Sequence, residues 1–173
     1  MQQRVWAQMA DQKKPQLLGE TLEEIEAFAG RLGRNDRLIG IDAGTKTLGL
    51  ALSDVSRMIA SPLQVLRRKK FSIDADELLR LAREHEVAGL VLGLPMNLDG
   101  TAGPRVQATR AFARNLNAIS ELPILLWDER LSTAEAERML IAADASRKRR
   151  AEVIDKLAAT IILQSALDRM RSV

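Results

Sequence analysis

The amino-acid sequence predicts an α/β domain with a mixed five-stranded sheet flanked by helices. Strand-like runs at 38–43, 47–53 and 61–67 succeed one another through short connections, which is typical of an antiparallel meander. Helix and strand patterns alternate after them, which indicates parallel βαβ units. The run at 87–94 is apolar on both faces, as expected of a central parallel strand that helices cover on each side.

Residues 1–36 differ in composition from the rest of the chain, and they predict a partly helical N-terminal arm ahead of one domain at residues 37–173. Thr21 to Glu24 has the form of a capping box, so we expect a helix to begin there. Apolar side chains then recur at helical spacing, and Gly33 provides a stop.

The other elements are predicted from periodicity and from capping residues. We expect a helix over 74–86, because Asp74 and Glu77 occupy capping positions at its start and apolar residues share one of its faces. The further expected elements are a helix from Pro104 to about Asn117, a strand at 124–127, a helix capped by Ser132 and Glu135, and a last helix at about 152–170.

Composition limits the chemistry that the chain can perform. The absence of cysteine excludes disulfides, thiolate metal sites and cysteine nucleophiles, and the single histidine, His85, makes a zinc site built on imidazoles an unfavourable hypothesis. No leader segment and no run of roughly 20 apolar residues is present, so we expect a cytoplasmic protein without a membrane partner.

Basic residues are concentrated in two short runs. The net charge is only +3, from 26 basic and 23 acidic side chains, so the basic excess matters only where it is local. The runs at 67–70 and 147–150 are dense enough to indicate a polyanionic partner such as nucleic acid. The alternative is that both runs are solvated loops.

Acidic residues from distant parts of the chain form the strongest functional signal. Asp42 is the only charge inside an apolar strand, and an isolated buried carboxylate is too costly to keep without a positive partner. Asp128 and Glu129 come after the last strand, and ligands of open α/β sheets gather at the carboxyl ends of parallel strands. Asp155 falls on the inward face of the last helix, although it could instead cap that helix or pair with a neighbouring basic residue.

Three carboxylates without histidine or cysteine would form a hard oxygen site, which selects Mg²⁺ or Mn²⁺. Two such ions about 3.5–4 Å apart activate water and stabilise the leaving oxygen in phosphodiester hydrolysis. We expect Lys46 and Arg130 to neutralise developing charge, and we count Asn97 among the substrate-binding residues. Asp128 and Glu129 leave the strand on opposite faces, so either could be the ligand, and we favour Glu129.

Four segments in order carry a resemblance to a known family. They are GIDAGTKTLGLALSD, GLPMNLDGTAGP, DERLSTAEAERML and VIDKLAATIILQSALD, and together they resemble the YqgF family, also called RuvX or Holliday junction resolvase. The resemblance covers about residues 37 to 170 and implies an RNase H-like fold with Asp42, Glu129 and Asp155 as metal-binding acids. It also implies a metal-dependent nuclease that processes the 5′ end of pre-16S rRNA or resolves branched DNA.

Two other hypotheses stay open at this level. The chain could be a nucleic-acid-binding factor whose acids hold only a structural ion. It could also be a nucleotide-dependent phosphotransferase, because the turn at 42–46 resembles the first phosphate loop of the actin and sugar-kinase fold, which needs two such domains. A junction resolvase needs two active sites and an RNA nuclease needs one, so we expect a monomer or a weak homodimer.

Overall fold

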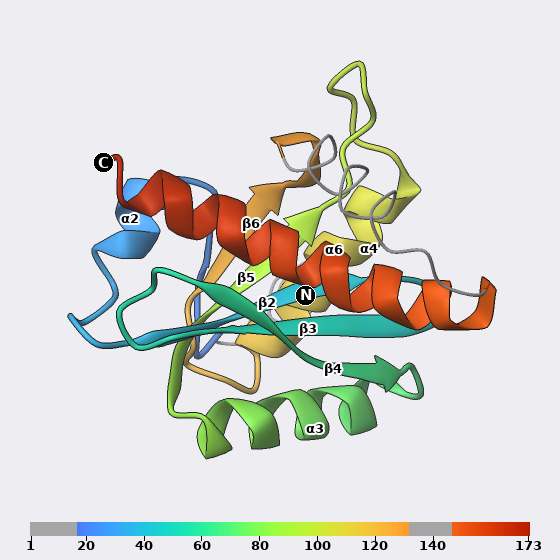
Figure 1. Ribbon diagram of the computed structural model, residues 1–173, viewed down its shortest axis with the longest axis horizontal. Helices are drawn as coiled ribbons and strands as arrows, with labels where there is room; N and C mark the ends of the chain where they lie inside the picture. Colours follow the sequence, from blue (N-terminus) through green and yellow to red (C-terminus); the bar gives the residue numbers. More distant parts are fainter. Residues whose placement is uncertain (1–16, 132–146) are drawn as a thin grey trace, which may run out of the picture.

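The computed structural model describes residues 17–131 and 147–173, and for 147–155 it describes the backbone alone. A mixed sheet in the order β1-β6-β5-β2-β3-β4 forms its centre (Figure 1). The strands are β1 (Thr21–Leu22), β2 (Arg37–Ala43), β3 (Thr47–Ser53), β4 (Ala60–Arg67), β5 (Val87–Leu94) and β6 (Ile124–Asp128). The helices are α2 (Ile25–Ala29), α3 (Phe71–Glu84), α4 (Pro104–Asn117), the short 3-10 helix η1 (Glu129–Leu131) and α6 (Arg147–Met170).

The expected meander and parallel units are confirmed. Strands β2, β3 and β4 pair antiparallel, and β5 pairs parallel with both β2 and β6. The sheet has six strands where five were expected, because β1 pairs parallel with β6 at the edge of the sheet. A strand of two residues is too short to show the period-two pattern by which strands are recognised.

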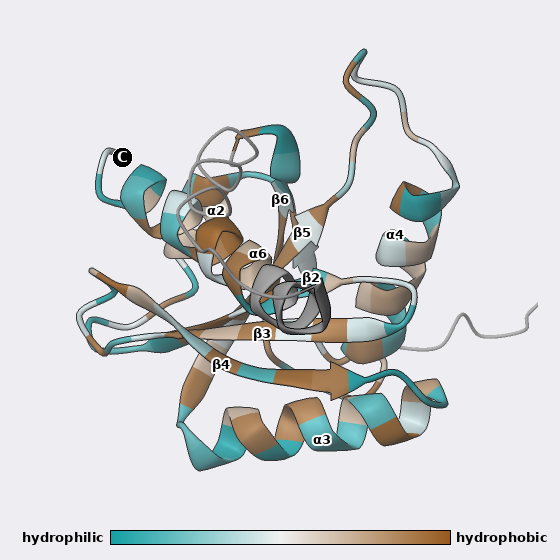
Figure 2. Ribbon diagram, turned by 45° about the vertical axis from the view of Figure 1, so that its right-hand side comes forward, coloured by the Kyte–Doolittle hydropathy of each residue, from teal (hydrophilic) through white to brown (hydrophobic). Residues whose placement is uncertain are grey.

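The sheet separates two hydrophobic cores. Side chains alternate between the faces of a strand, so Ile39 and Ile41 of β2 point to one face and Leu38 points to the other. The first face packs against α3 and α4, and the second packs against α2 and α6. Figure 2 shows the apolar sides of α3 and α4 turned toward the strands. No helix within 17–131 or 147–173 has the length and apolar character to cross a membrane.

The described part of the N-terminal arm belongs to the second core. Phe28 of α2 is fully buried there. The expected capping box is wrong: Thr21 lies in β1, and α2 begins at Ile25 after Glu24, which makes no side-chain capping bond. Tertiary contacts explain this, because the Thr21 hydroxyl accepts a hydrogen bond from the Asn117 side chain and the Thr21 backbone pairs with β6.

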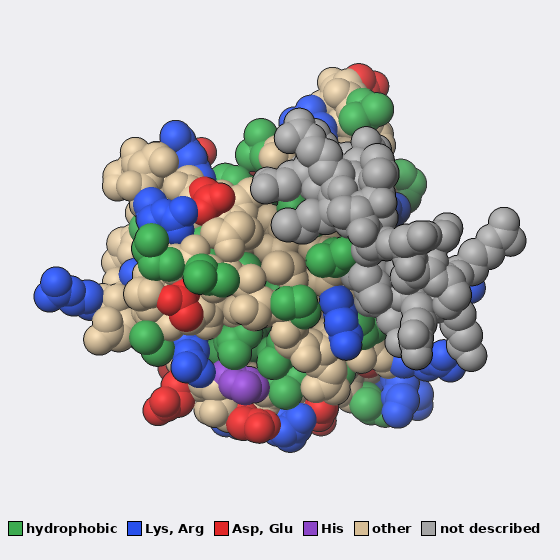
Figure 3. Space-filling view, viewed as in Figure 1, with side chains coloured by type: hydrophobic (Ala, Val, Ile, Leu, Met, Phe, Trp, Pro, Cys, Tyr) green, Lys and Arg blue, Asp and Glu red, His purple; other side chains and the backbone are tan. Residues whose placement is uncertain are grey.

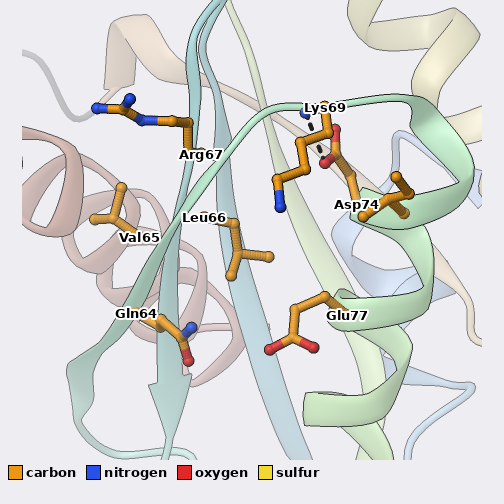
Figure 4. A pocket seen from close by; sticks show the side chains of 8 residues that line it. Gln64, Val65, Leu66, Arg67, Lys69, Asp74 and Glu77 are labelled. Carbon is orange, nitrogen blue, oxygen red and sulfur yellow. Dashed lines mark hydrogen bonds between the residues drawn. The ribbon is translucent and has the colours of Figure 1, made fainter.

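Two helices begin earlier than expected. Helix α3 begins at Phe71, and Asp74 lies within it, where its carboxylate accepts a hydrogen bond from the Lys69 N–H at 2.9 Å (Figure 4). Asp74 is therefore a buried support for the β4–α3 connection and does not mark the start of the helix. Helix α6 begins at Arg147, before the expected residue 152. The expected helix capped by Ser132 and Glu135 lies outside the described residues.

Helix α6 lies directly on β2 where the strand has a glycine. A Cβ atom at Gly40 would lie 2.6 Å from Leu163 Cβ and 2.9 Å from the Ala159 carbonyl oxygen. Further along the helix, Gln164 accepts a hydrogen bond from the Ala60 N–H at 2.9 Å, beside the β3–β4 turn. The C-terminal half of α6 therefore lies over this turn, and its N-terminal half lies nearer the carboxyl end of β2 (Figure 1).

We expect Gly40→Ala to lower the free energy of unfolding by about 1–3 kcal/mol, because the added methyl group overpacks the β2–α6 contact. Gly30→Ala is the matched control, since a Cβ there would have its nearest neighbours at 3.5 Å. Urea denaturation of both variants measures the difference, and equal stabilities would contradict the packing described.

Candidate active site

Two carboxylates lie on the α6 face of the sheet at the carboxyl ends of its parallel strands. Asp42 is next to last in β2 and points to the same face as Gly40, which contacts α6. Glu129 comes directly after β6 and is in phase with Trp127, which is buried against α6 and donates a hydrogen bond to Ser165 at 2.6 Å. Strand β5 lies between the two acids.

A glycine on β5 makes room for the Glu129 side chain. A Cβ atom at Gly93 would lie 2.6 Å from Glu129 Oε1 and 2.6 Å from Ile162 Cδ1 of α6. The Glu129 carboxyl group is thus enclosed between the sheet and the helix. Glycine inside an apolar strand often marks a close approach of this kind, so Gly93 is the sequence signal from which this enclosure could have been predicted.

The two carboxylates repel each other electrostatically. Burial, together with the negative charge of Asp42, raises the pKa of Glu129 to about 7 from an ordinary value of 4.5. Asp128 adds to this rise, whereas the positive charge of Arg105 opposes it. Paired carboxylates in such surroundings are stabilised by a cation, and their hard oxygen atoms fit Mg²⁺ or Mn²⁺. The donor set present here is therefore compatible with the expected metal.

The neighbouring Asp128 has a different role. Its two carboxylate oxygens accept hydrogen bonds from the Arg130 side chain at 2.6–3.1 Å, and these bonds hold the pKa of Asp128 below its usual range. Arg130 is thereby fixed in η1, and its charge also acts on Asp99. Of the two adjacent acids, Glu129 is the one that shares a face with Asp42.

Asp155 lies in the N-terminal half of α6, one helical turn before Ala159. Ala159 is fully buried against the sheet, and the residues of α6 that precede it lie nearer the carboxyl end of β2. The side chain of Asp155 falls outside the described part of the structure. Within the part that is described, no three His, Cys, Asp or Glu side chains gather as a metal site. Asp42 acts on Glu129 electrostatically.

The three expected substrate-binding residues all come after strands that end at this edge. Lys46 is exposed in the turn after β2. Asn97 comes after β5, and its side-chain amide donates to the Thr101 hydroxyl at 2.9 Å, which closes the loop over 97–101. Arg130 comes after β6 and is bound to Asp128. One further basic residue near the acids, Arg105, was not predicted, because a single exposed arginine at a helix start has no distinctive pattern.

Solved structures share the fold. A Thermus thermophilus RuvC structure aligns with a TM-score of 0.51 at 13% identity, covering 78% of this chain and 96% of that chain. The complex of T. thermophilus RuvC with a Holliday junction substrate aligns with a TM-score of 0.50 at 16% identity and the same coverage. The chain therefore has the RNase H-like fold of the RuvC-type resolvases, as the sequence predicted.

Closer relatives define the family. The family model RuvX, described as Holliday junction resolvase, matches residues 36–169. A protein of Paracoccus denitrificans is 58% identical over 149 residues, covering 86% of this chain and 94% of the relative. One of Beijerinckia indica is 62% identical over 139 residues, covering 80% and 84%. Both carry the name "Putative pre-16S rRNA nuclease". The chain belongs to the RuvX family.

The raised pKa of Glu129 predicts a stability difference that depends on pH. Below pH 4.5 the Glu129 carboxyl group is protonated in both the folded and the unfolded protein. As the pH rises, this group ionises in the unfolded chain before it ionises in the folded protein, so its contribution to the free energy of unfolding is lost as the pH rises through about 7. We therefore expect Glu129→Gln, without metal, to be more stable than the parent by about 2 kcal/mol at pH 8, allowing for partial solvent screening.

Denaturant unfolding of the metal-free proteins at pH 4 and pH 8 measures this difference, which should nearly vanish at the lower pH. Glu121→Gln serves as the control, because Glu121 is exposed on the surface. A constant difference across this range would contradict the raised pKa of Glu129.

Proposed function

We propose that this member of the RuvX family is a metal-dependent endonuclease that hydrolyses phosphodiester bonds in structured nucleic acid. The observation that carries the proposal is the Asp42–Glu129 pair, in which burial and like charge raise the pKa of Glu129 at the carboxyl edge of an RNase H-like sheet. Two partly buried acids that repel each other are stabilised when a cation binds to both, so the pair favours a metal site over a purely structural role.

The roles of the residues are inferred from their places. Asp42 and Glu129 would hold Mg²⁺ or Mn²⁺, and Asp155 would supply a third carboxylate from α6. Ions held by these carboxylates would supply the chemistry that activates water and stabilises the leaving oxygen. Asp128 orients Arg130 through two hydrogen-bonded oxygens, so that the guanidinium group stays at the edge where a phosphate backbone would pass. Lys46 and Asn97 would contact the substrate from the turns after β2 and β5.

The substrate that we favour is pre-16S rRNA, because the relatives at 58% and 62% identity carry the name "Putative pre-16S rRNA nuclease". The 5′ end is the part of it that the family resemblance implies. The alternative is branched DNA, which the description of the RuvX family supports. Junction resolution requires two active sites in a dimer, whereas cleavage at one RNA end requires a single site. Light scattering with and without a four-way junction distinguishes the two: a monomer throughout would exclude the resolvase role.

Removal of the first metal ligand tests the activity directly. We expect Asp42→Asn to lower metal-dependent cleavage by on the order of a hundredfold or more while the protein stays folded. Asp76→Asn is the matched control, because Asp76 is exposed on α3 and undergoes the same chemical change. The assay uses pre-rRNA, junction, single-stranded and duplex substrates with Mg²⁺ and Mn²⁺. Undiminished cleavage by Asp42→Asn would refute the proposal.

A substitution beside the acids tests their arrangement without removing either. We expect Gly93→Ala to lower metal affinity or cleavage by about tenfold or more, because the new methyl group displaces the Glu129 carboxyl group. The atoms that must move are the ends of the Glu129 and Ile162 side chains, so the fold should persist. Calorimetric titration with Mn²⁺ measures the affinity, with Gly103→Ala as the control. Unchanged affinity would show that Glu129 is not a ligand.

A further inference from the structure

A second feature lies at the same edge of the sheet, on the α4 side. A pocket of about 60 Å³ opens there, and its lining includes Gly44, Thr45, Arg68, Arg105, Thr109 and Phe112. This volume is far below the roughly 300 Å³ or more of pockets that enclose a small molecule, so the pocket suits a single charged group. Two guanidinium groups line it, which makes that group an anion.

Arg68 is held in position by three contacts. Its Nη1 donates to the Gly44 carbonyl oxygen at 2.8 Å, its Nε lies 3.8 Å from Asp74 Oδ2, and its guanidinium group lies over the Phe112 ring at 5.6 Å from the centroid. Long basic side chains lose much rotamer freedom when they bind a ligand. Because these contacts already fix the Arg68 head group, less of this entropy is lost on binding.

The neighbours of Arg68 do not share its direction. Figure 4 shows Arg67 pointing away from the space between β4 and α3, and Lys69 pointing into that space toward Glu77. Basic side chains gather at this end of the molecule in Figure 3, over the β4–α3 connection. Of the three, only Arg68 is directed at the end of β2, so the run 67–70 is not one uniform patch.

Arg105 approaches the pocket from the opposite side. It is exposed in the first turn of α4, directly after Pro104, and none of the salt bridges among the described residues involves it. Its charge reaches Glu129, because it opposes the rise in the pKa of that residue. The positive end of the α4 dipole adds to the attraction for an anion at this place.

The pocket and the carboxylate pair lie on opposite faces of one strand end. Asp42 points to the α6 face, and its neighbour Ala43 lines the pocket on the α4 face. A nucleic-acid strand that crosses the carboxyl edge of the sheet would pass both. One phosphate would lie at the acids, and another phosphate of the same strand would lie at the two arginines.

We propose that the pocket between Arg68 and Arg105 binds a backbone phosphate of the nucleic-acid substrate next to the cleaved linkage. This inference rests on the proposed nuclease function and adds to it a positioning site that contacts the sugar-phosphate backbone without reading base sequence. Arg68 comes from the β4–α3 connection and Arg105 comes from α4. The pocket therefore lies on the α3 and α4 side of the sheet, whereas Asp42 and Glu129 lie on the α6 side.

The test measures binding in the absence of divalent metal, so that cleavage does not enter. Fluorescence anisotropy with a labelled single-stranded RNA and with a four-way DNA junction gives the dissociation constant over a range of salt concentrations. We expect Arg105→Gln to weaken binding by about tenfold at low salt and to reduce the slope of log K against log salt by about one. Arg114→Gln is the matched control, because Arg114 is exposed on the same helix and loses the same charge.

A second probe identifies the group that is bound. A single neutral methylphosphonate linkage, moved stepwise along the RNA, should weaken binding by the parent protein at one position and have no effect there on Arg105→Gln. Arg68→Lys keeps the charge of the second arginine and loses its planar donors, so it should show an intermediate loss. Equal affinities and salt slopes for Arg105→Gln and Arg114→Gln would overturn the proposed pocket.

The outcomes separate this inference from the function on which it rests. If Arg105→Gln cleaves normally and binds RNA as tightly as the Arg114→Gln control, the phosphate pocket is refuted and the nuclease function stands. A parent protein that binds RNA but cleaves it with neither Mg²⁺ nor Mn²⁺ would refute the nuclease function. Loss of binding in Arg105→Gln would in that case still support the pocket.

Discussion

The close contact between helix α6 and the sheet is the constraint on which the site depends. Two glycines on the same face, Gly40 of β2 and Gly93 of β5, lack the Cβ atoms that would hold the helix away. The first allows the helix backbone to approach the strand, and the second leaves space for the Glu129 carboxyl group beneath Ile162. Burial of that carboxyl group beside Asp42, and therefore its raised pKa, is a consequence of this packing and not of any special chemistry of the residues themselves.

The acids and the arginine pocket lie on opposite faces of the sheet. The α6 face carries the acids and the α4 face carries the arginine pocket, and the charge of Arg105 still acts on Glu129 across the sheet edge. Consecutive residues such as Asp42 and Ala43 lie on the two faces because a strand directs them to opposite sides. Asp128 and Glu129 repeat the pattern at the end of β6, where Asp128 binds Arg130 and Glu129 faces Asp42.

Much of this fold could be predicted from the sequence, for identifiable reasons. The five longer strands have long apolar or alternating runs between clear breaks, and β5 was bounded correctly because it is apolar on both faces. The start of α2 was not predictable from Thr21, since a capping pattern competes with a bond to Asn117 that is 96 residues away in sequence. Asp42 and Glu129 were chosen as candidates because strand ends converge, whereas Arg68 and Arg105 meet only through the packing of α4, which no local pattern encodes.

The pKa of Glu129 near 7 also gives the site a proton to exchange. With a pKa near 7 the Glu129 carboxyl group would be partly protonated at neutral pH, and an ion held by both acids, as we propose, would displace that proton. Loading the site would therefore acidify a weakly buffered solution, and the apparent affinity for the ion would fall as the medium becomes more acidic. The fraction of sites that hold an ion would then depend on both the free ion concentration and the pH.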